Sequence, residues 1–302
     1  MESREKQSMK KSIRKVLILV SGFCMILTEA VNAAEVSYIS DVIYGRKDGM
    51  ALTYDVLQPE NANGAAIVFM MSGGWYSSWG APETRATQFA DMLEAGFTMI
   101  PVYHGSAPLY KVPDAYSDVD MAVRHIKANA ETYQIDSNRI GLTGGSAGGH
   151  LSLMVGLNSD SGKADARNTI VQQDNKVATI VAYFPPVDFR SDQAEAQGII
   201  NEVEQDELMQ RFPALDYDEA MIPMMSPITH VDSNDPPVLL IHGDADPLVH
   251  VTHSHAMLAT LKKFDVPSEL IVISGGKHGF GGENAKIANA ARLAWFERHL
   301  NQ

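Results

Sequence analysis

Short apolar runs alternate with helical patterns along most of the chain, and this alternation limits the possible folds more than any other feature of the sequence. Uninterrupted runs of this kind are typical of strands that helices cover on both faces. Six of them occur, at residues 65–71, 97–102, 139–142, 177–184, 237–242 and 270–273. Helical patterns occupy residues 82–95, 115–133, 147–157, 253–264 and 283–300. The alternation predicts right-handed crossovers and a mostly parallel central sheet with helices on both faces.

Two segments depart from this alternation. Residues 36–44 and 50–57 have a strand-like pattern and flank the polar turn 45–49, which predicts an N-terminal β-hairpin. Residues 189–230 are acidic and rich in methionine, with a helical pattern over 193–211 and several prolines after it. We interpret them as a small lid insertion over the active site, although the methionines could simply fill gaps in a core. The length suits one large α/β domain, residues 34–302.

The N-terminal 33 residues differ from the rest. Four basic residues, Lys10, Lys11, Arg14 and Lys15, precede an apolar segment that ends in small residues at Ala33. This pattern predicts a signal peptide cleaved after Ala33, and therefore a secreted or periplasmic protein. The alternative is a membrane anchor, but the apolar run is broken at Ser21-Gly22 and is short of the roughly 20 apolar residues that a span needs.

The charge and the cysteine content narrow the classes of function. Removal of residues 1–33 takes away six basic and three acidic residues and moves the formal charge from −13 to −16. Such a surface repels phosphate backbones and anionic lipids, so we expect no nucleic-acid partner and no membrane partner for the mature protein. The only cysteine, Cys24, lies in the predicted signal peptide. We therefore expect no disulfide and no thiol chemistry in the mature chain. The sequence does not indicate an oligomeric state.

The apolar run 139–142 leads into Gly144-Gly145-Ser146-Ala147-Gly148 and then into a helical pattern. A G-x-S-x-G sequence between a strand and a helix is typical of a nucleophile elbow. The tight turn leaves no room for Cβ atoms at Gly144 and Gly148, and it directs the Ala147 N–H toward an oxyanion beside the serine. The alternative is an ordinary glycine-rich loop, because so short a motif also arises by chance.

A serine nucleophile needs a base, and the base needs a carboxylate that orients it. Two loops after later apolar runs supply candidates in the order Ser, Asp, His, with Asp246 as the acid and His278 as the base. Asp246 is preferred because it lies at the loop tip before a proline, whereas Asp244 comes earlier and could brace the turn. His278 lies in a glycine-rich loop, which disfavours a packed core position.

The loop after residues 65–71 is the candidate for the second oxyanion donor. Gly73 and Gly74 allow a backbone N–H to approach the substrate closely, and Trp75 is a third candidate donor. Trp75 and Tyr76 could also form a wall of the substrate site. The alternative for the Trp75 side chain is packing in the core.

From about Tyr44 to Leu300 the chain resembles the α/β-hydrolase superfamily, and within it secreted esterases of the hormone-sensitive-lipase, feruloyl-esterase and acetylxylan-esterase kind. Residues 72–75 resemble the family's H-G-G-G-W loop, residues 144–150 its G-x-S-A-G-G-H elbow, and residues 242–246 its H-G-x-x-D acid loop. The resemblance implies an α/β-hydrolase fold and carboxylic-ester hydrolysis through Ser146, His278 and Asp246. It also implies a small ester or an acylated carbohydrate, with acetyl or feruloyl groups, as the substrate.

The chain departs from this family at two loops. The family's H-G is Met71-Ser72 here, so the oxyanion loop must be braced in another way. The segment around His104 replaces the family's Y-R-L-A-P, and His104 could line the substrate site or be packed elsewhere. Asp188 follows the sixth strand, where it could line the site or cap a turn.

Other functions remain possible at this stage. His250 and His253 could share a helix face and bind a metal, but no carboxylate at helical spacing and no cysteine supports them, so we expect neither a metal nor a cofactor. A serine peptidase of the prolyl-oligopeptidase catalytic type has a similar elbow and acid loop, but it carries a large N-terminal propeller. A non-catalytic carbohydrate-binding protein on the same fold is the third possibility, which a complete Ser, Asp and His set disfavours.

Overall fold

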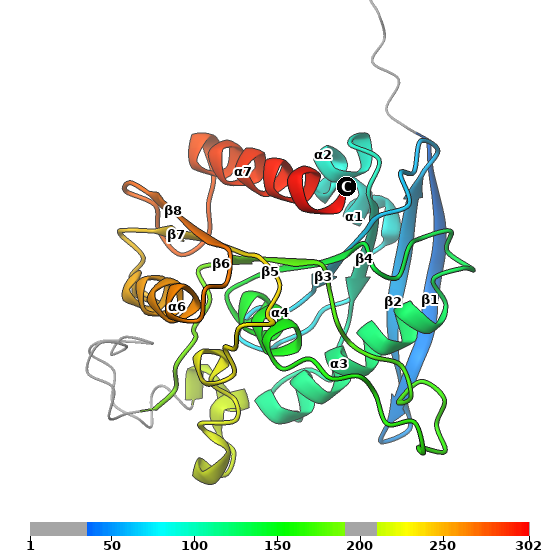
Figure 1. Ribbon diagram of the computed structural model, residues 1–302, viewed down its shortest axis with the longest axis horizontal. Helices are drawn as coiled ribbons and strands as arrows, with labels where there is room; N and C mark the ends of the chain where they lie inside the picture. Colours follow the sequence, from blue (N-terminus) through cyan, green and yellow to red (C-terminus); the bar gives the residue numbers. More distant parts are fainter. Residues whose placement is uncertain (1–34, 191–209, 302) are drawn as a thin grey trace, which may run out of the picture. The chain divides into compact units, whose positions relative to one another are not determined.

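The computed structural model describes residues 35–190 and 210–301 (Figure 1). The predicted signal peptide lies outside these residues, as does nearly all of the helical pattern that we noted at 193–211. Contacts between Cα atoms group these described residues into a single compact unit. Within the two described ranges, no helix has both the length and the apolar character needed to cross a bilayer.

The predicted N-terminal hairpin is confirmed. Strands β1 (Val36–Lys47) and β2 (Met50–Pro59) pair in the antiparallel sense. The turn is tighter than expected, because β1 continues through Lys47 and only Asp48 and Gly49 join the strands. Both turn residues have positive φ, 48° and 82°. This is the backbone that a two-residue hairpin requires, and aspartate followed by glycine adopts it readily.

The predicted mostly parallel sheet is also confirmed. Its strands lie in the order β1-β2-β4-β3-β5-β6-β7-β8. Those after the hairpin are β3 (Ala66–Met70), β4 (Thr98–Val102), β5 (Ile140–Gly145), β6 (Thr179–Tyr183), β7 (Val238–Gly243) and β8 (Ser268–Ile273). Neighbours from β4 to β8 pair in parallel, and β2 joins β4 in the antiparallel sense. The carboxyl ends of β3, β5, β7 and β8 therefore share one edge of the sheet, which is where open α/β sheets place their ligands.

Helices cover both faces of the sheet (Figure 1). One face carries α1 (Pro82–Gln88), α2 (Ala90–Glu94) and α7 (Gly282–Leu300), and the other carries α3 (Val112–Ala128), α4 (Ala147–Leu157) and α6 (Thr252–Lys263). The predicted helix at 82–95 is interrupted at Phe89, whose φ and ψ are −108° and 18°. Its ring is fully buried and lies 5.0 Å from that of Phe69. The buried core lies on both faces of the sheet, with one cluster under α3 and α4 and another under α2 and α7. This is expected for strands with continuous apolar runs.

The described part of the predicted lid, residues 189–190 and 210–230, contains three short 3₁₀ helices. They are η1 (Pro213–Leu215), η2 (Glu219–Met221) and η3 (Pro227–Thr229), and two of them begin at prolines. The core-filling interpretation of its methionines holds for Met225, while the interpretation of the segment as a lid stays a prediction. Met225 is buried against the core, whereas Met224 is 57% exposed.

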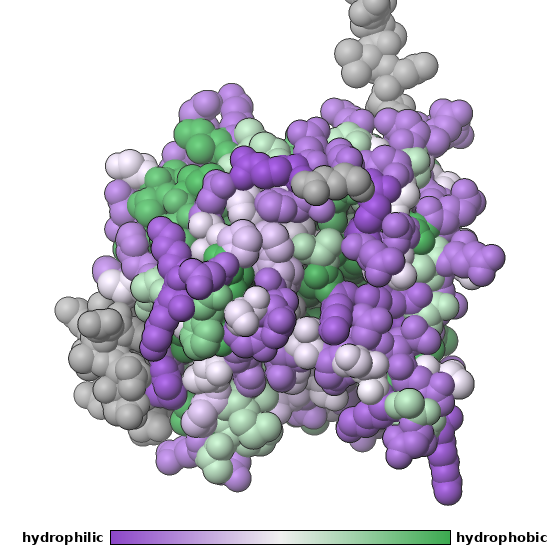
Figure 2. Space-filling view, viewed as in Figure 1, coloured by the Kyte–Doolittle hydropathy of each residue, from purple (hydrophilic) through white to green (hydrophobic). Residues whose placement is uncertain are grey.

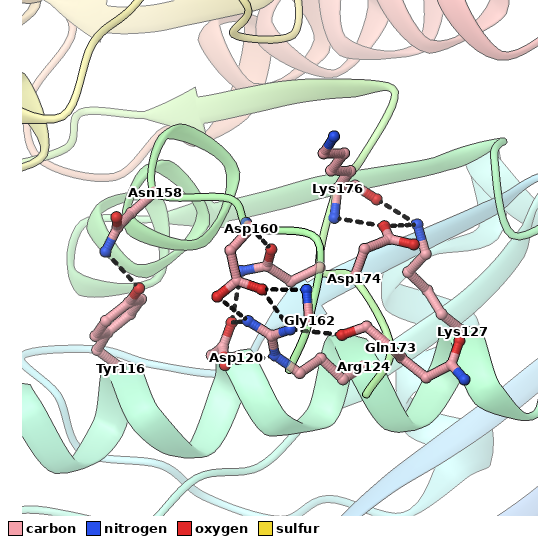
Figure 3. Close-up of polar contacts among 11 residues, drawn as sticks. Tyr116, Asp120, Arg124, Lys127, Asn158, Asp160, Gly162, Gln173, Asp174 and Lys176 are labelled. Atoms are coloured by element: carbon pink, nitrogen blue, oxygen red, sulfur yellow. Dashed lines mark hydrogen bonds and ion pairs between the residues drawn. The ribbon is translucent and has the colours of Figure 1, made fainter. Parts of the chain in front are cut away.

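Polar contacts hold the long loop between α4 and β6 against α3 (Figure 3). The guanidinium of Arg124 donates to Asp120 and Asp160 and to the Gln173 carbonyl. Lys127 pairs with Asp174 at 2.6 Å. These contacts fasten a loop that has no strand or helix of its own.

The face of the molecule shown in Figure 2 is mainly hydrophilic with smaller hydrophobic areas.

Candidate active site

Ser146 lies between the last residue of β5 and the first residue of α4. Its φ and ψ are 54° and −120°, a conformation that L-residues rarely adopt. Two contacts fix it, because the Ser146 N–H donates to the Tyr183 carbonyl and the Ser146 carbonyl accepts the His150 N–H, each at 2.9 Å. The glycines are sterically required: a Cβ on Gly144 would lie 2.5 Å from the Gly148 carbonyl carbon, and one on Gly148 would lie 2.5 Å from the Met70 oxygen.

His278 lies between Ser146 and Asp246. The loop after β8 brings His278 Nε2 to 2.9 Å from Ser146 Oγ, and Nδ1 to 2.7 Å from Asp246 Oδ2. An ionised carboxylate can only accept, so Nδ1 carries the proton and the serine hydroxyl donates to Nε2. The alternative acid, Asp244, accepts the Gly275 N–H instead, and so braces the turn.

Asp246 is held as a carboxylate. Burial raises the pKa of its carboxyl group, but hydrogen bonds from His242, His278 and the Leu248 N–H outweigh burial and bring the pKa well below its usual value. Oδ1 accepts the N–H groups of Leu248 and Val249 at 2.8 and 3.0 Å. A permanent negative charge is thus placed beside the ring nitrogen of His278 that faces away from the serine.

The predicted oxyanion loop, residues 72–76, is a small hairpin. Gly73 and Tyr76 exchange two backbone hydrogen bonds of 3.0 Å, and the two residues between them have positive φ, 57° at Gly74 and 60° at Trp75. Because the Gly73 N–H donates to the Tyr76 carbonyl, Gly73 differs from our expectation of a free donor. The N–H groups of Gly74 and Ala147 have no acceptor within the described parts of the chain. Gly74 and Ala147 are therefore the donors that this geometry favours.

A cavity of about 660 Å³ lies over Ser146. Its lining consists of Phe69, Met70, Met71, Ser72, Gly73, Gly74, Tyr76, Ser78, Arg85, Gly145, Ser146, Phe184, Phe212, Leu248, His278 and Gly279. Residues after β3, β5, β6, β7 and β8 meet here, which is the arrangement expected at the carboxyl edge of the sheet. Phe212 brings part of the predicted lid segment to the cavity.

Of the four substrate-contacting residues that the sequence suggested, only Tyr76 lines this cavity, and its side chain is 42% exposed. Trp75 is buried, with its ring 5.5 Å from that of His150, so the alternative of core packing is the observed one. His104 is buried and bonded to Ser72 Oγ. Asp188 is buried and pairs with Arg190. None of these three residues lines the cavity, because each side chain is buried against a neighbour, as the alternatives from the sequence allowed.

Sequence reasoning missed several residues that line the cavity, Phe184 and Arg85 among them. Phe184, directly after β6, has a φ of 35° and places its ring 4.7 Å from the His278 imidazole. Arg85, in α1, is the only lysine or arginine among the described residues that line the cavity. The position of Phe184 after a buried strand was a usable signal. Nothing in the local sequence distinguished Arg85 from a surface residue of a helix.

The possible metal pair does not come together as a site. His253 is buried and its Nδ1 accepts the Val187 N–H, whereas His250 Nδ1 contacts the Thr252 hydroxyl. Among the described residues, no group of three or more histidine, cysteine, aspartate or glutamate side chains is arranged to hold a metal ion.

Comparison with solved structures places the chain among known folds. A truncated carbohydrate esterase from gut microbiota aligns with a TM-score of 0.69 and 24% identity over 90% of this chain and 99% of its own. An acetyl ester-xyloside bifunctional hydrolase from Caldicellulosiruptor lactoaceticus aligns with a TM-score of 0.70 and 23% identity over 86% and 96%. These likenesses confirm the α/β-hydrolase fold.

Relatives are also found by sequence. Esterase LipQ of Mycobacterium tuberculosis is 25% identical over 74% of this chain and 52% of its own length. Ethyl acetate hydrolase of Pseudomonas putida is 26% identical over 82% and 77%. The chain spans about half the length of the first curated relatives that it matches. The BD-FAE family model matches residues 54–261, which is more than half of the chain, and the protein therefore belongs to the BD-FAE family.

Proposed function

We propose that the protein is a serine carboxylesterase with Ser146 as nucleophile, His278 as base and Asp246 as the carboxylate that orients the base. The observation that carries this proposal is the continuous chain of hydrogen bonds from Ser146 Oγ through both ring nitrogens of His278 to Asp246. In the first step His278 Nε2 takes the serine proton while Oγ attacks the ester carbonyl. Asp246 stabilises the imidazolium that forms.

The tetrahedral intermediate carries a negative oxygen, which we assign to the N–H groups of Ala147 and Gly74. Donors of this kind act where charge develops and are each worth about 10²–10³ in kcat. Collapse of the intermediate expels the alcohol, which takes the proton from His278 and leaves an acyl group on Ser146. Water then attacks the acyl-enzyme with His278 again as the base, and the acid is released.

For the substrate we propose small esters, including acyl groups on carbohydrate. Support comes from the proteins that this chain is similar to. Two of the similar structures are a carbohydrate esterase and an acetyl ester-xyloside bifunctional hydrolase, and one relative is an ethyl acetate hydrolase. Exposed aromatic surface for a sugar ring is also present, because Tyr76, which lines the cavity, is 42% exposed and Trp79, which follows the lining residue Ser78 in sequence, is 57% exposed. We further propose that residues 1–33 direct export, so the mass of the exported protein should correspond to a chain beginning at Ala34.

The test compares the wild type with Ser146→Ala on p-nitrophenyl acetate and maps a fluorophosphonate adduct by mass spectrometry. Wild-type activity should fall by about 10⁴-fold or more in the variant, and the adduct should lie on the peptide that contains Ser146. Activity that survives the substitution would refute the nucleophile. A wild type without ester hydrolysis would point to the peptidase if it cleaves amides, and to a binding protein if it cleaves neither. Acetylated xylo-oligosaccharide and feruloylated arabinose then separate the acyl groups.

A further inference from the structure

The oxyanion loop lacks the histidine of the family motif, yet Ser72 within it makes a direct side-chain contact. Ser72 Oγ lies 2.9 Å from Nε2 of His104, a residue on the loop that follows β4. We propose that His104 is a positioning residue for ester hydrolysis, which sets the oxyanion loop by accepting the hydrogen bond of the Ser72 hydroxyl. The proposal rests on the esterase function proposed above.

The direction of this hydrogen bond follows from the other ring nitrogen. Nδ1 of His104 lies 2.8 Å from the Gly105 carbonyl, which can only accept, so Nδ1 carries the proton. Nε2 of the neutral ring is then an acceptor, and the Ser72 hydroxyl donates to it. The ring is buried, and burial lowers the pKa of His104 to about 4, which keeps it neutral at ordinary pH.

Ser72 connects this contact to the catalytic elements. Its carbonyl accepts the Gly148 N–H at 3.2 Å, in the first turn of α4, and its own N–H donates to the Met70 carbonyl at 2.9 Å. The next residue begins the hairpin that presents the Gly74 N–H. Ser72 is thus linked to both proposed oxyanion donors, to Ala147 through the first turn of α4 and to Gly74 through the hairpin. A shift of Ser72 would therefore change the separation of these two N–H groups.

The loop after β4 also holds the far end of the oxyanion loop. The Ala107 N–H donates to the Trp75 carbonyl at 3.1 Å, and the His104 N–H donates to Ser77 Oγ at 3.2 Å. The loop is itself anchored from the other side. Asp118 accepts the Gly105 N–H at 2.9 Å.

Lys47 completes this anchor, since its ammonium group lies 2.7 Å from the Asp118 carboxylate. His104 is absent from the lining of the cavity, so any effect on catalysis must pass through Ser72 and its neighbours. This placement separates a positioning role from direct contact with substrate.

The decisive comparison is between two replacements of His104. In His104→Gln, the side-chain oxygen can reach the position of Nε2 and accept from Ser72, whereas the shorter side chain of His104→Asn reaches only the position of Nδ1. We expect kcat to fall about 10- to 100-fold in His104→Asn and in Ser72→Ala, with KM changed less than about threefold. His104→Gln should recover most of the lost kcat. Ser72→Ala removes only a hydroxyl, so it tests the contact if the larger changes impair folding.

Two further measurements exclude a merely structural effect. Rates are normalised to sites titrated by the fluorophosphonate, and affinity is measured for a trifluoromethyl ketone, which forms an oxyanion on Ser146. That affinity should fall in parallel with kcat/KM. The double variant Ser72→Ala/His104→Asn should be no worse than either single variant, because both remove the same contact. Tyr116→Phe, which removes a hydrogen bond to Asn158 outside the cavity, is the matched control and should keep the wild-type kcat.

Two results would overturn the positioning role. One is a wild-type kcat and inhibitor affinity in folded Ser72→Ala and His104→Asn, and the other is losses that add in the double variant. If the wild type neither hydrolyses esters nor reacts with the phosphonate, the proposed function itself fails and this role fails with it. If the wild type is active and the brace variants are unchanged, only the role of His104 is refuted.

Discussion

His150 makes stability depend on pH in a way that can be measured. Its ring is buried between Trp75 of the oxyanion loop and Met225 of the segment 210–230. Trp75 Nε1–H donates to Nδ1 at 3.4 Å, and Nε2–H donates to the Met225 carbonyl at 2.8 Å. Burial lowers the pKa of His150 from 6.5 to about 4, although the bond to the Met225 carbonyl opposes that shift. Protonation would also place a proton on Nδ1, against the indole N–H that donates to it.

The sign follows from the lowered pKa. Below pH 6.5 the unfolded chain takes up a proton on His150 while the folded chain does not, so protonation favours the unfolded state. The stability that the neutral ring contributes is complete above pH 6.5 and is lost as the pH falls toward 4. At pH 5 the two pKa values, 6.5 and about 4, give a loss of about 2 kcal/mol relative to pH 7.5.

The perturbation is His150→Gln, which has no titratable group. Urea unfolding followed by circular dichroism gives the free energy of unfolding of both proteins at pH 7.5 and pH 5. The advantage of the wild type over the variant should shrink by about 2 kcal/mol between these two values. Thr87→Ala, at an exposed position of α1 without a titratable side chain, is the control, and its difference from the wild type should stay constant. A difference for His150→Gln that does not change with pH would refute the reasoning.

Two shorter predictions concern the elbow and the cavity. Gly144→Ala should abolish ester hydrolysis and lower the thermal midpoint by several degrees, because its Cβ would lie 2.5 Å from the Gly148 carbonyl carbon. Gly281→Ala is the control. Its Cβ would meet open space, so neither the activity nor the thermal midpoint should change in the same assays. Arg85 lines the cavity, and its guanidinium donates to two neutral groups, the Gln88 side chain and the Ser78 carbonyl, so Arg85→Gln should lower kcat/KM for p-nitrophenyl hemisuccinate about tenfold relative to p-nitrophenyl butyrate. Equal losses on the two esters would exclude a role of its charge in substrate choice.

The features that the sequence could predict depend on regular periodicity or on tight local sterics. Continuous apolar runs predicted the parallel strands, because both faces of each strand are covered. The glycines around Ser146 predicted a turn without room for Cβ atoms. In the structure a Cβ on Gly144 would lie only 2.5 Å from the Gly148 carbonyl carbon. The preference for Asp246 over Asp244 also came from the local sequence, since Asp246 lies at the loop tip before a proline that fixes its backbone.

The features that it could not predict depend on contacts between loops distant in sequence. Trp75 and Tyr76 are adjacent in a loop, yet one is buried against His150 and the other lines the cavity. The hairpin at Gly73 decides which way the two side chains point. Its two backbone hydrogen bonds could not be predicted from residue propensities. That hairpin also occupies the Gly73 N–H and transfers the expected donor role to Gly74. Asp188 was ambiguous for the same reason, because its partner Arg190 could equally have faced solvent.

The two departures from the family motif illustrate why position-by-position comparison has limits. Ser72 and His104 are 32 residues apart, and the sequence treated them separately, Ser72 as part of a loop without the family's bracing histidine and His104 as a possible wall of the site. In the structure they are the two ends of a single hydrogen bond of 2.9 Å. A hydroxyl at position 72 is useful to the loop only if an acceptor lies opposite it, and a buried neutral histidine is such an acceptor. We therefore expect substitutions at these two positions to be tolerated only in combinations that keep a donor facing an acceptor.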